Sequence, residues 1–171
     1  MADFATSVQP APPLGMITLR GDLADLGPAV QAAVGQDVPG QRRIALAEGR
    51  GVAWMAPDEL LLILPREDIA PALARLQDAL GDSFATAADV SDARAAFRIT
   101  GPRADEVLMK LAPVDIARLE PGEIRRTRAA QTAAAFWREG DGFTLLCARS
   151  VAGYMAEALS NAARPGGAVF A

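Results

Sequence analysis

Histidine is absent from the 171-residue sequence, which contains only one cysteine, Cys147, and one lysine, Lys110. Without histidine the chain cannot form a Ser-His-Asp triad, a Cys-His pair or an imidazole metal site, and the commonest general base is missing. A single cysteine excludes a disulfide framework and any CxxC metal or redox motif. One lysine leaves a single candidate for Schiff-base chemistry. The composition therefore excludes most of the common catalytic centres.

Long apolar runs are also missing, and none approaches the roughly 18 residues that a membrane span needs. Residues 1–15 have no basic start and no apolar core, so they do not resemble a signal peptide. We therefore expect a cytoplasmic protein. Pro10, Pro12 and Pro13 favour a flexible N-terminal arm over residues 1–15. A proline and two glycines after the last predicted helix favour a C-terminal tail over residues 164–171.

The residues that are present have the composition of a globular domain, with 51% hydrophobic and 22% charged side chains. The net charge of −4 argues against nucleic acid as the main partner. Residues 1–93 hold six arginines against thirteen acidic residues, a net charge of −7, whereas residues 94–171 carry +3. This asymmetry fits two lobes that face different neighbours, and it fits chance equally well.

The two halves of the sequence resemble each other at an offset of about 80 residues. Residues 17–21 (ITLRG) are matched by residues 97–101 (FRITG), and an Ala-Asp pair follows each of them at the same distance. Trp54 precedes an apolar strand and a helix, and Trp137 does the same. The matched positions favour an internal duplication over a chance alternation of strands and helices. They also favour a core position for both tryptophans over an interface.

Hydrophobic periodicity predicts an α+β fold. We expect two tandem ferredoxin-like βαββαβ halves with approximate twofold symmetry, over about 16–91 and 92–163, within one duplicated domain over 16–163. Ser150 is expected to cap the last helix. The predicted helices cover about 28–35, 69–80, 104–111 and the residues after 150, and the predicted strands cover 16–21, 43–48, 52–55, 59–64, 84–90, 95–100, 124–130, 132–138 and 143–148.

Few residues are candidates for chemistry. Asp82, Asp89 and Asp92 lie close in sequence, but they lack the alternating spacing and the sharp glycine turn of a cation-binding loop. We expect Ser91 or Asp92 to serve a turn or a cap instead. Cys147 stands within an apolar strand, which is typical of a small buried hydrophobic residue rather than of a reactive thiol. We therefore predict no catalytic, cofactor-binding or metal-binding residue.

Arg125, Arg126 and Arg128 are the most concentrated positive feature of the sequence. In a strand, Arg126 and Arg128 share one face and Arg125 points to the other. Such a row can hold an anionic ligand or the acidic surface of a partner through bidentate contacts. A solvated sheet face paired with Glu120 and Glu123 is an equal alternative. We take the three arginines as a candidate partner interface.

Four separated segments resemble one known family when they are taken together. They are residues 53–62 (AWMAPDELLL), 89–101 (DVSDARAAFRITG), 121–137 (PGEIRRTRAAQTAAAFW) and 149–154 (RSVAGY). In this order they resemble the gamma subunit of bacterial heterotetrameric sarcosine oxidases, over roughly residues 14–163. The resemblance also implies that this chain folds like one domain of the glycine-cleavage aminomethyltransferase.

The resemblance implies a subunit of an oxidoreductase complex that is not itself catalytic. In that family the complex oxidatively demethylates sarcosine to glycine, forming hydrogen peroxide and, with tetrahydrofolate, methylenetetrahydrofolate. The alpha subunit carries NAD and tetrahydrofolate, the beta subunit FAD and FMN, and the delta subunit a zinc. We therefore expect no cofactor in this chain. Its expected partners are the alpha, beta and delta subunits, mainly the folate-handling part of alpha.

Two alternatives stay open. The first is a free-standing folate-binding or one-carbon domain of the same superfamily. Its stand-alone relatives in iron–sulfur maintenance carry a Lys-Gly-Cys-Tyr-x-Gly-Gln-Glu type of motif, which this sequence lacks. The second alternative is a homo-oligomeric scaffold that has lost its tetramer partners. Whichever reading holds for the complex, a chain isolated from its partner is expected to expose an apolar patch or to hide it by self-association.

Overall fold

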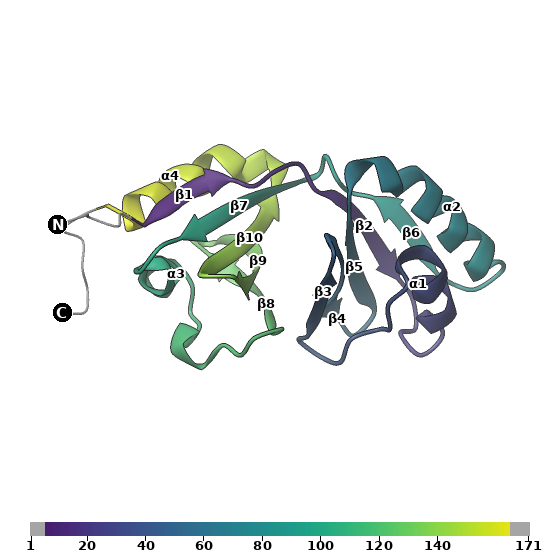
Figure 1. Ribbon diagram of the computed structural model, residues 1–171. Coiled ribbons are helices and arrows are strands. Elements are labelled where there is room, and N and C mark those ends of the chain that lie inside the picture. The colour runs from purple at the N-terminus through teal and green to yellow at the C-terminus, as the bar shows by residue number, and fades with distance from the viewer. Residues whose placement is uncertain (1–5, 165–171) are drawn as a thin grey trace. The chain divides into compact units, whose positions relative to one another are not determined.

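The computed structural model describes residues 6–164 (Figure 1), and it divides into two compact units. Unit 1 combines residues 1–12 with residues 93–171, and unit 2 is formed by residues 13–92. The sequence predicts a division of the chain at about residue 91, and the structure divides it after Asp92. The predicted C-terminal tail lies, from residue 165 on, outside the described part of the chain.

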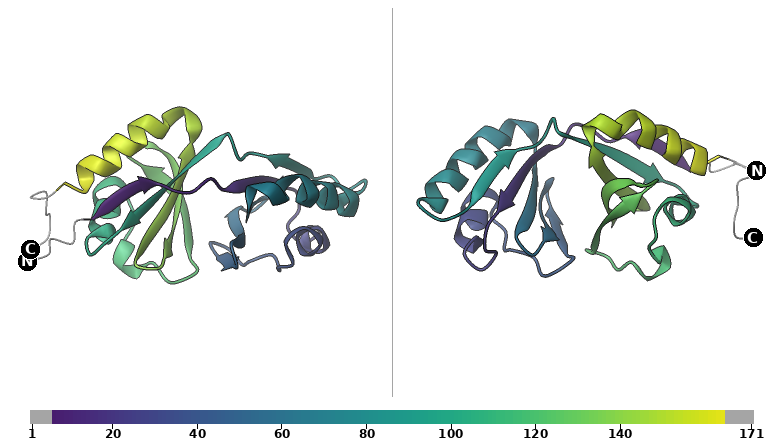
Figure 2. Two further views of the ribbon diagram at one scale, coloured as in Figure 1. Left: turned by 45° about the horizontal axis from the view of Figure 1, so that its top comes forward. Right: turned by 180° about the vertical axis from the view of Figure 1, so that it is seen from behind.

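Unit 2 is a five-stranded antiparallel sheet with two helices against one face (Figures 1 and 2). Its elements are β2 (Gly15–Arg20), α1 (Gly27–Val34), β3 (Ile44–Ala47), β4 (Arg50–Ala56), β5 (Glu59–Leu64), α2 (Ile69–Leu80) and β6 (Thr86–Asp89). The strand order is β3-β4-β5-β2-β6. Without β3 this is the split βαβ arrangement of a ferredoxin-like unit, and β3 adds one strand at the edge.

Unit 1 repeats this arrangement with a sheet of order β1-β7-β10-β9-β8. Its elements are β1 (Ser7–Pro10), β7 (Arg94–Thr100), α3 (Ala104–Leu111), β8 (Ile124–Ala129), β9 (Thr132–Glu139), β10 (Gly142–Ala148) and α4 (Ala152–Ala162). Side chains of both helices and of the central strands form a single apolar cluster. Each unit therefore has its own core.

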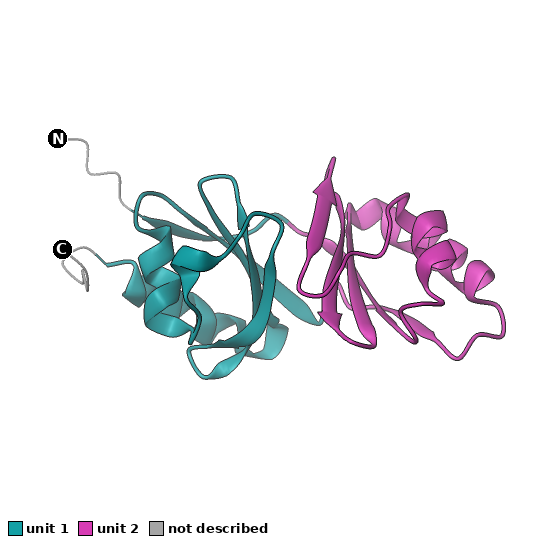
Figure 3. Ribbon diagram, turned by 90° about the horizontal axis from the view of Figure 1, so that it is seen from below, with its two compact units in different colours: residues 1–12, 93–171 teal, residues 13–92 magenta. Residues whose placement is uncertain are grey.

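Figure 3 colours residues 1–12 with unit 1, although they come before unit 2 in the chain. The edge strands beside β2 in unit 2 and beside β7 in unit 1 therefore come from different parts of the sequence. In unit 2 it is β6, which follows α2 along the chain and pairs with β2. In unit 1 it is β1, from the start of the chain, which pairs with β7 from Ser7↔Thr100 to Pro10↔Phe97. The sheet of the half over residues 92–163 is thus completed by a strand from outside that half.

The prediction of a flexible arm over residues 1–15 is wrong for its described part. Val8 packs against the core of unit 1, and the Ala11 amide donates a hydrogen bond to the Ala96 carbonyl at 2.9 Å. Pro10 is compatible with the strand because an edge strand leaves one side of its backbone without partners. The part of the predicted arm over residues 1–5 lies outside the described residues.

The matched sequence segments take equivalent places in the two units. Residues 17–21 lie in β2 and its end, and residues 97–101 in β7 and its end, and each strand leads into a helix. Trp54 is half-buried in β4, and Trp137 is buried in the equivalent strand β9. The twofold relation between the halves stays a prediction.

Local periodicity accounts for most elements. Ile69, Ala72, Leu76 and Leu80 form the buried face of α2, and Gly81 ends the helix with a positive φ of 50°. Every residue of β5 is buried, as expected for a strand in the middle of a sheet. No helix within residues 6–164 is long and apolar enough to cross a membrane.

Two local predictions are wrong. α4 begins at Ala152 after a short 3-10 turn (Arg149–Val151), and Val151 rather than Ser150 occupies the N-cap, without a side-chain hydrogen bond. β6 begins at Thr86, so Phe84 lies in the preceding loop and not in a strand. Tertiary packing sets both boundaries, because neither cap nor strand is strongly specified by local sequence.

Candidate functional site

The acidic residues near the end of unit 2 have partners within the polypeptide. The Asp89 carboxylate accepts hydrogen bonds from Ser91, and Asp92 pairs with Arg66. Within residues 6–164 no group of three His, Cys, Asp or Glu side chains is placed to hold a metal ion. The turn that we expected at Ser91 or Asp92 is present, with Asp89 as the acceptor of an Asx-type turn.

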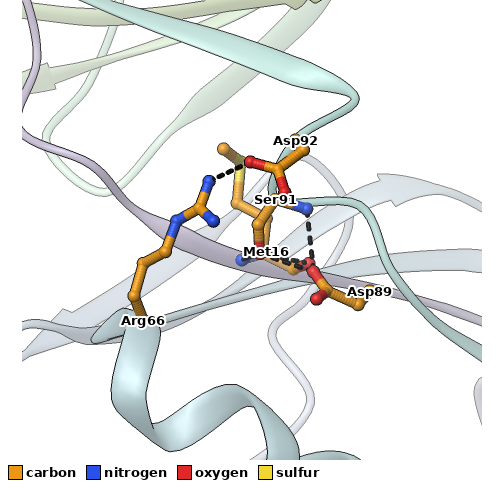
Figure 4. Close-up of polar contacts among 5 residues, drawn as sticks. All are labelled: Met16, Arg66, Asp89, Ser91 and Asp92. Carbon is orange, nitrogen blue, oxygen red and sulfur yellow. Dashed lines mark hydrogen bonds and ion pairs between the residues drawn. The ribbon is translucent and has the colours of Figure 1, made fainter.

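Ser91 is the centre of a small polar cluster where the chain leaves unit 2 (Figure 4). Its hydroxyl accepts a hydrogen bond from the Met16 amide at 2.9 Å and donates one to Asp89 Oδ1 at 2.5 Å. The Ser91 amide donates to the same carboxylate oxygen at 2.9 Å. The side chain of Ser91 thereby continues the β2–β6 ladder for one bond beyond β6. The hydroxyl and the amide of Ser91 are both used in hydrogen bonds within the chain, which is a structural role.

Replacing Ser91 with alanine should lower the free energy of unfolding by about 1–3 kcal/mol, because the amide of buried Met16 loses its acceptor. Urea denaturation measures the change. Arg66→Ala is the matched control, since it removes an ion pair with exposed Asp92 and should have little effect. An unfolding midpoint of Ser91→Ala equal to that of the wild type would contradict the assigned role.

Cys147 has the buried apolar role that its sequence context predicts. It lies in β10 as part of the core of unit 1, and it is a free thiol. Burial raises the pKa of the Cys147 thiol above its ordinary value, and the charge of Arg149 opposes this only in part. Burial thus disfavours the thiolate, as is typical of a small buried hydrophobic residue.

The three arginines lie on β8, an edge strand of unit 1. Ala129 belongs to the core cluster that includes the helices, so alternation places Arg125 on the helix side of the sheet. Arg126 and Arg128 share the opposite side, and both are exposed. The predicted division of the three side chains between two faces is confirmed.

Arg125 differs from the other two in its surroundings. Its Nη2 pairs with Glu123 at 2.8 Å, and the Glu123 side chain is only 7% exposed. Glu123 also accepts a hydrogen bond from the Glu120 amide at 3.1 Å. The alternative of a sheet face paired with glutamates therefore applies to Arg125. Arg126 and Arg128 are exposed on the opposite side of β8, and we call the surface that they form the basic face.

The turn after β8 was not predicted from sequence. Ala130 and Gln131 have φ values of 47° and 66°, which side chains other than glycine rarely adopt. Arg128 donates through Nε and Nη2 to the Gln131 carbonyl at 3.1 and 2.7 Å, and the Tyr154 hydroxyl donates to the Ala130 carbonyl at 3.0 Å. These contacts hold the turn and fix the end of the basic face.

A second surface feature, also missed from sequence, lies in unit 2. A hollow of about 610 Å³ is lined by residues 20–22, 57–58 and 83–86, from the end of β2, the β4–β5 turn and the loop before β6. Phe84 is fully exposed at its edge. The three segments are far apart in sequence, so no local pattern indicates the hollow.

Comparison with known proteins identifies the family. The sequence model of the "Sarcosine oxidase, gamma subunit family" matches residues 20–164. The sarcosine oxidase subunit gamma of Corynebacterium sp. (strain P-1) is 38% identical over 90 residues, which cover 52% of this chain and 43% of that protein. The chain spans about half the length of the curated gamma subunits that it matches.

Solved structures agree with this result. A chain of the heterotetrameric sarcosine oxidase from Corynebacterium sp. U-96 is similar with a TM-score of 0.88 at 25% identity, over 100% of this chain and 90% of that one. Aminomethyltransferase T of the Bartonella henselae glycine cleavage system is similar with a TM-score of 0.70 at 16% identity, over 91% and 45% of the two chains, and shows the fold. The resemblance found in the sequence is confirmed: the chain belongs to the sarcosine oxidase gamma subunit family.

Proposed function

We propose that this chain is the gamma subunit of a heterotetrameric oxidase that demethylates sarcosine or a closely related N-methyl amino acid. The observation that carries the proposal is the similarity, over the whole chain and with a TM-score of 0.88, to a chain of a heterotetrameric sarcosine oxidase. The whole complex forms glycine, hydrogen peroxide and methylenetetrahydrofolate. FAD, FMN, NAD and tetrahydrofolate are bound by the other subunits.

The role of this chain is to hold partner subunits and not to perform the chemistry. It has no histidine, and its one thiol is buried. Its partners are the alpha, beta and delta subunits, mainly the folate-handling part of alpha.

The basic face is the contact that we propose for an acidic surface of the alpha subunit. Arg126 and Arg128 lie on the same side of an edge strand and are exposed. Guanidinium groups bind carboxylates through charge-assisted hydrogen bonds, so two of them on one face fit a partner with carboxylates at matching spacing.

Exchanging Arg126 and Arg128 for glutamate should weaken the complex by more than about tenfold in Kd, because two attractive contacts become repulsive. The chain is co-expressed with the other subunits from its source, and co-purification is quantified. Arg118→Glu with Arg164→Glu makes the same change of charge at exposed residues elsewhere in unit 1 and should leave the complex intact.

Two outcomes would contradict the proposal. A complex that forms equally well with Arg126→Glu/Arg128→Glu at moderate salt would show that the basic face is not the interface. Demethylation of sarcosine by the isolated wild-type chain, or flavin retained by it, would show that the chain is not a cofactor-free subunit.

A further inference from the structure

Phe84 is more exposed to solvent than any other large apolar side chain within residues 6–164. Its relative exposure is 104%, compared with 52% for Tyr154 and 42% for Leu46. A phenylalanine side chain offers an unusually large apolar area for burial in an interface. The whole of this area is exposed beside a hollow, so it is available for burial against a partner.

The loop that carries Phe84 is anchored on both sides. The Ser83 amide donates to the Leu80 carbonyl at 2.9 Å, and the Ala85 amide donates to the Ser83 carbonyl at 2.7 Å. Gly21 allows a close approach at the base of the loop, because a Cβ at this position would lie 3.1 Å from the Ala85 Cβ. The aromatic ring is therefore held outward by a tight turn, which lowers the entropy lost on binding.

The surroundings of Phe84 are acidic. Asp22 and Asp58 line the hollow beside the ring and are exposed, and exposed Asp82 lies two residues before it. Arg20 in the same hollow is bound to Glu59 at 2.7 Å and lies 3.6 Å from Asp58. The positive charge of Arg20 is thus balanced by buried Glu59. The carboxylates of Asp22, Asp58 and Asp82 then give this surface a net negative charge.

We propose that Phe84 and the carboxylates of Asp22, Asp58 and Asp82 form an acidic docking surface for another subunit of the complex. The subunit supplies an apolar pocket for the ring and a rim of lysine or arginine side chains. Aromatic anchors surrounded by a charged rim are the usual form of an energetic hot spot. The inference rests on the proposed function. It also accounts for the charge asymmetry, since unit 2 offers this acidic surface and unit 1 the basic face.

Binding of the purified chain to the remaining subunits of its own enzyme tests the proposal. Phe84→Ser should raise Kd by about 30-fold or more, as for a hot-spot residue. Asp22→Asn/Asp82→Asn should raise Kd several-fold at low salt and reduce its salt dependence, because rim charges are screened. An asparagine side chain at position 22 keeps an oxygen that can accept the hydrogen bond from the Ala24 amide, so the loop should stay folded. Leu46→Ser, which removes an apolar side chain elsewhere on unit 2, is the matched control and should bind like the wild type.

The outcomes separate this inference from the proposed function. If the wild-type chain captures no subunit, both are wrong. If the wild type binds and Phe84→Ser binds equally well, only the docking surface is wrong. Self-association of the free chain that is lost in Phe84→Ser, with unchanged binding to the subunits, also overturns it. A lower Tm for Phe84→Ser would contradict the exposed position from which the argument starts.

Discussion

Replacing Gly142 with alanine is expected to destabilise unit 1 by at least about 3 kcal/mol, because the added carbon has no space. Gly142 opens β10 and lies opposite Thr100 of β7. A Cβ at this position would lie 1.9 Å from the Ile99 carbonyl oxygen and 3.0 Å from the Thr100 Cα. These are backbone atoms, so no change of rotamer relieves the overlap, and the β7–β10 ladder must separate locally.

Thermal and urea unfolding measure this effect. Gly153→Ala is the matched control: a Cβ there meets no atom within 4 Å, and the residue lies in α4. This variant should be more stable than the wild type by about 0.5–1 kcal/mol, since alanine favours the helix. Equal unfolding midpoints for Gly142→Ala and the wild type would show that the strands pair less closely than the structure has them.

Replacing Phe136 with alanine should lower the free energy of unfolding by about 3–5 kcal/mol, as for other large buried aromatic residues. Phe136 is fully buried in the core of unit 1. Its ring lies edge-on against Phe143, with centroids 6.4 Å apart and planes at 85°. The variant loses this contact and leaves a cavity that strands β9 and β10 cannot close without distortion.

The same substitution at an exposed ring provides the comparison. Phe84→Ala removes an equal number of atoms from a side chain that is 104% exposed, so the stability of the free chain should not change. Urea denaturation of both variants measures their free energies of unfolding. It shows whether the loss of stability depends on the burial of the ring or only on the removal of its atoms. A similar loss of stability in the two would contradict the assignment of Phe136 to the core and of Phe84 to the surface.

The candidate surfaces differ in how far the sequence predicts them. The period of two along a strand was enough to place Arg126 and Arg128 on one face and Arg125 on the other. It left open whether Arg125 pairs with Glu123, because the position of Glu123 depends on the fold of the preceding loop. The acidic docking surface around Phe84 was missed, since it is assembled from three segments that only the fold brings together.

By itself the sequence determined the helices and most strands, because apolar spacing and glycine or proline positions act over a few residues. Its lack of histidine also decided which kinds of catalytic site are impossible. Only the tertiary structure decided the place of β1. Prolines near the start of the chain favour an extended segment, and whether that segment is free or a strand depends on a partner. The partner is β7, which pairs Ser7 with Thr100 and whose unit buries Val8. The residues that pair with β1 lie about 90 positions further along the chain. Because the strand depends on them, the sequence around β1 has no local pattern that predicts it.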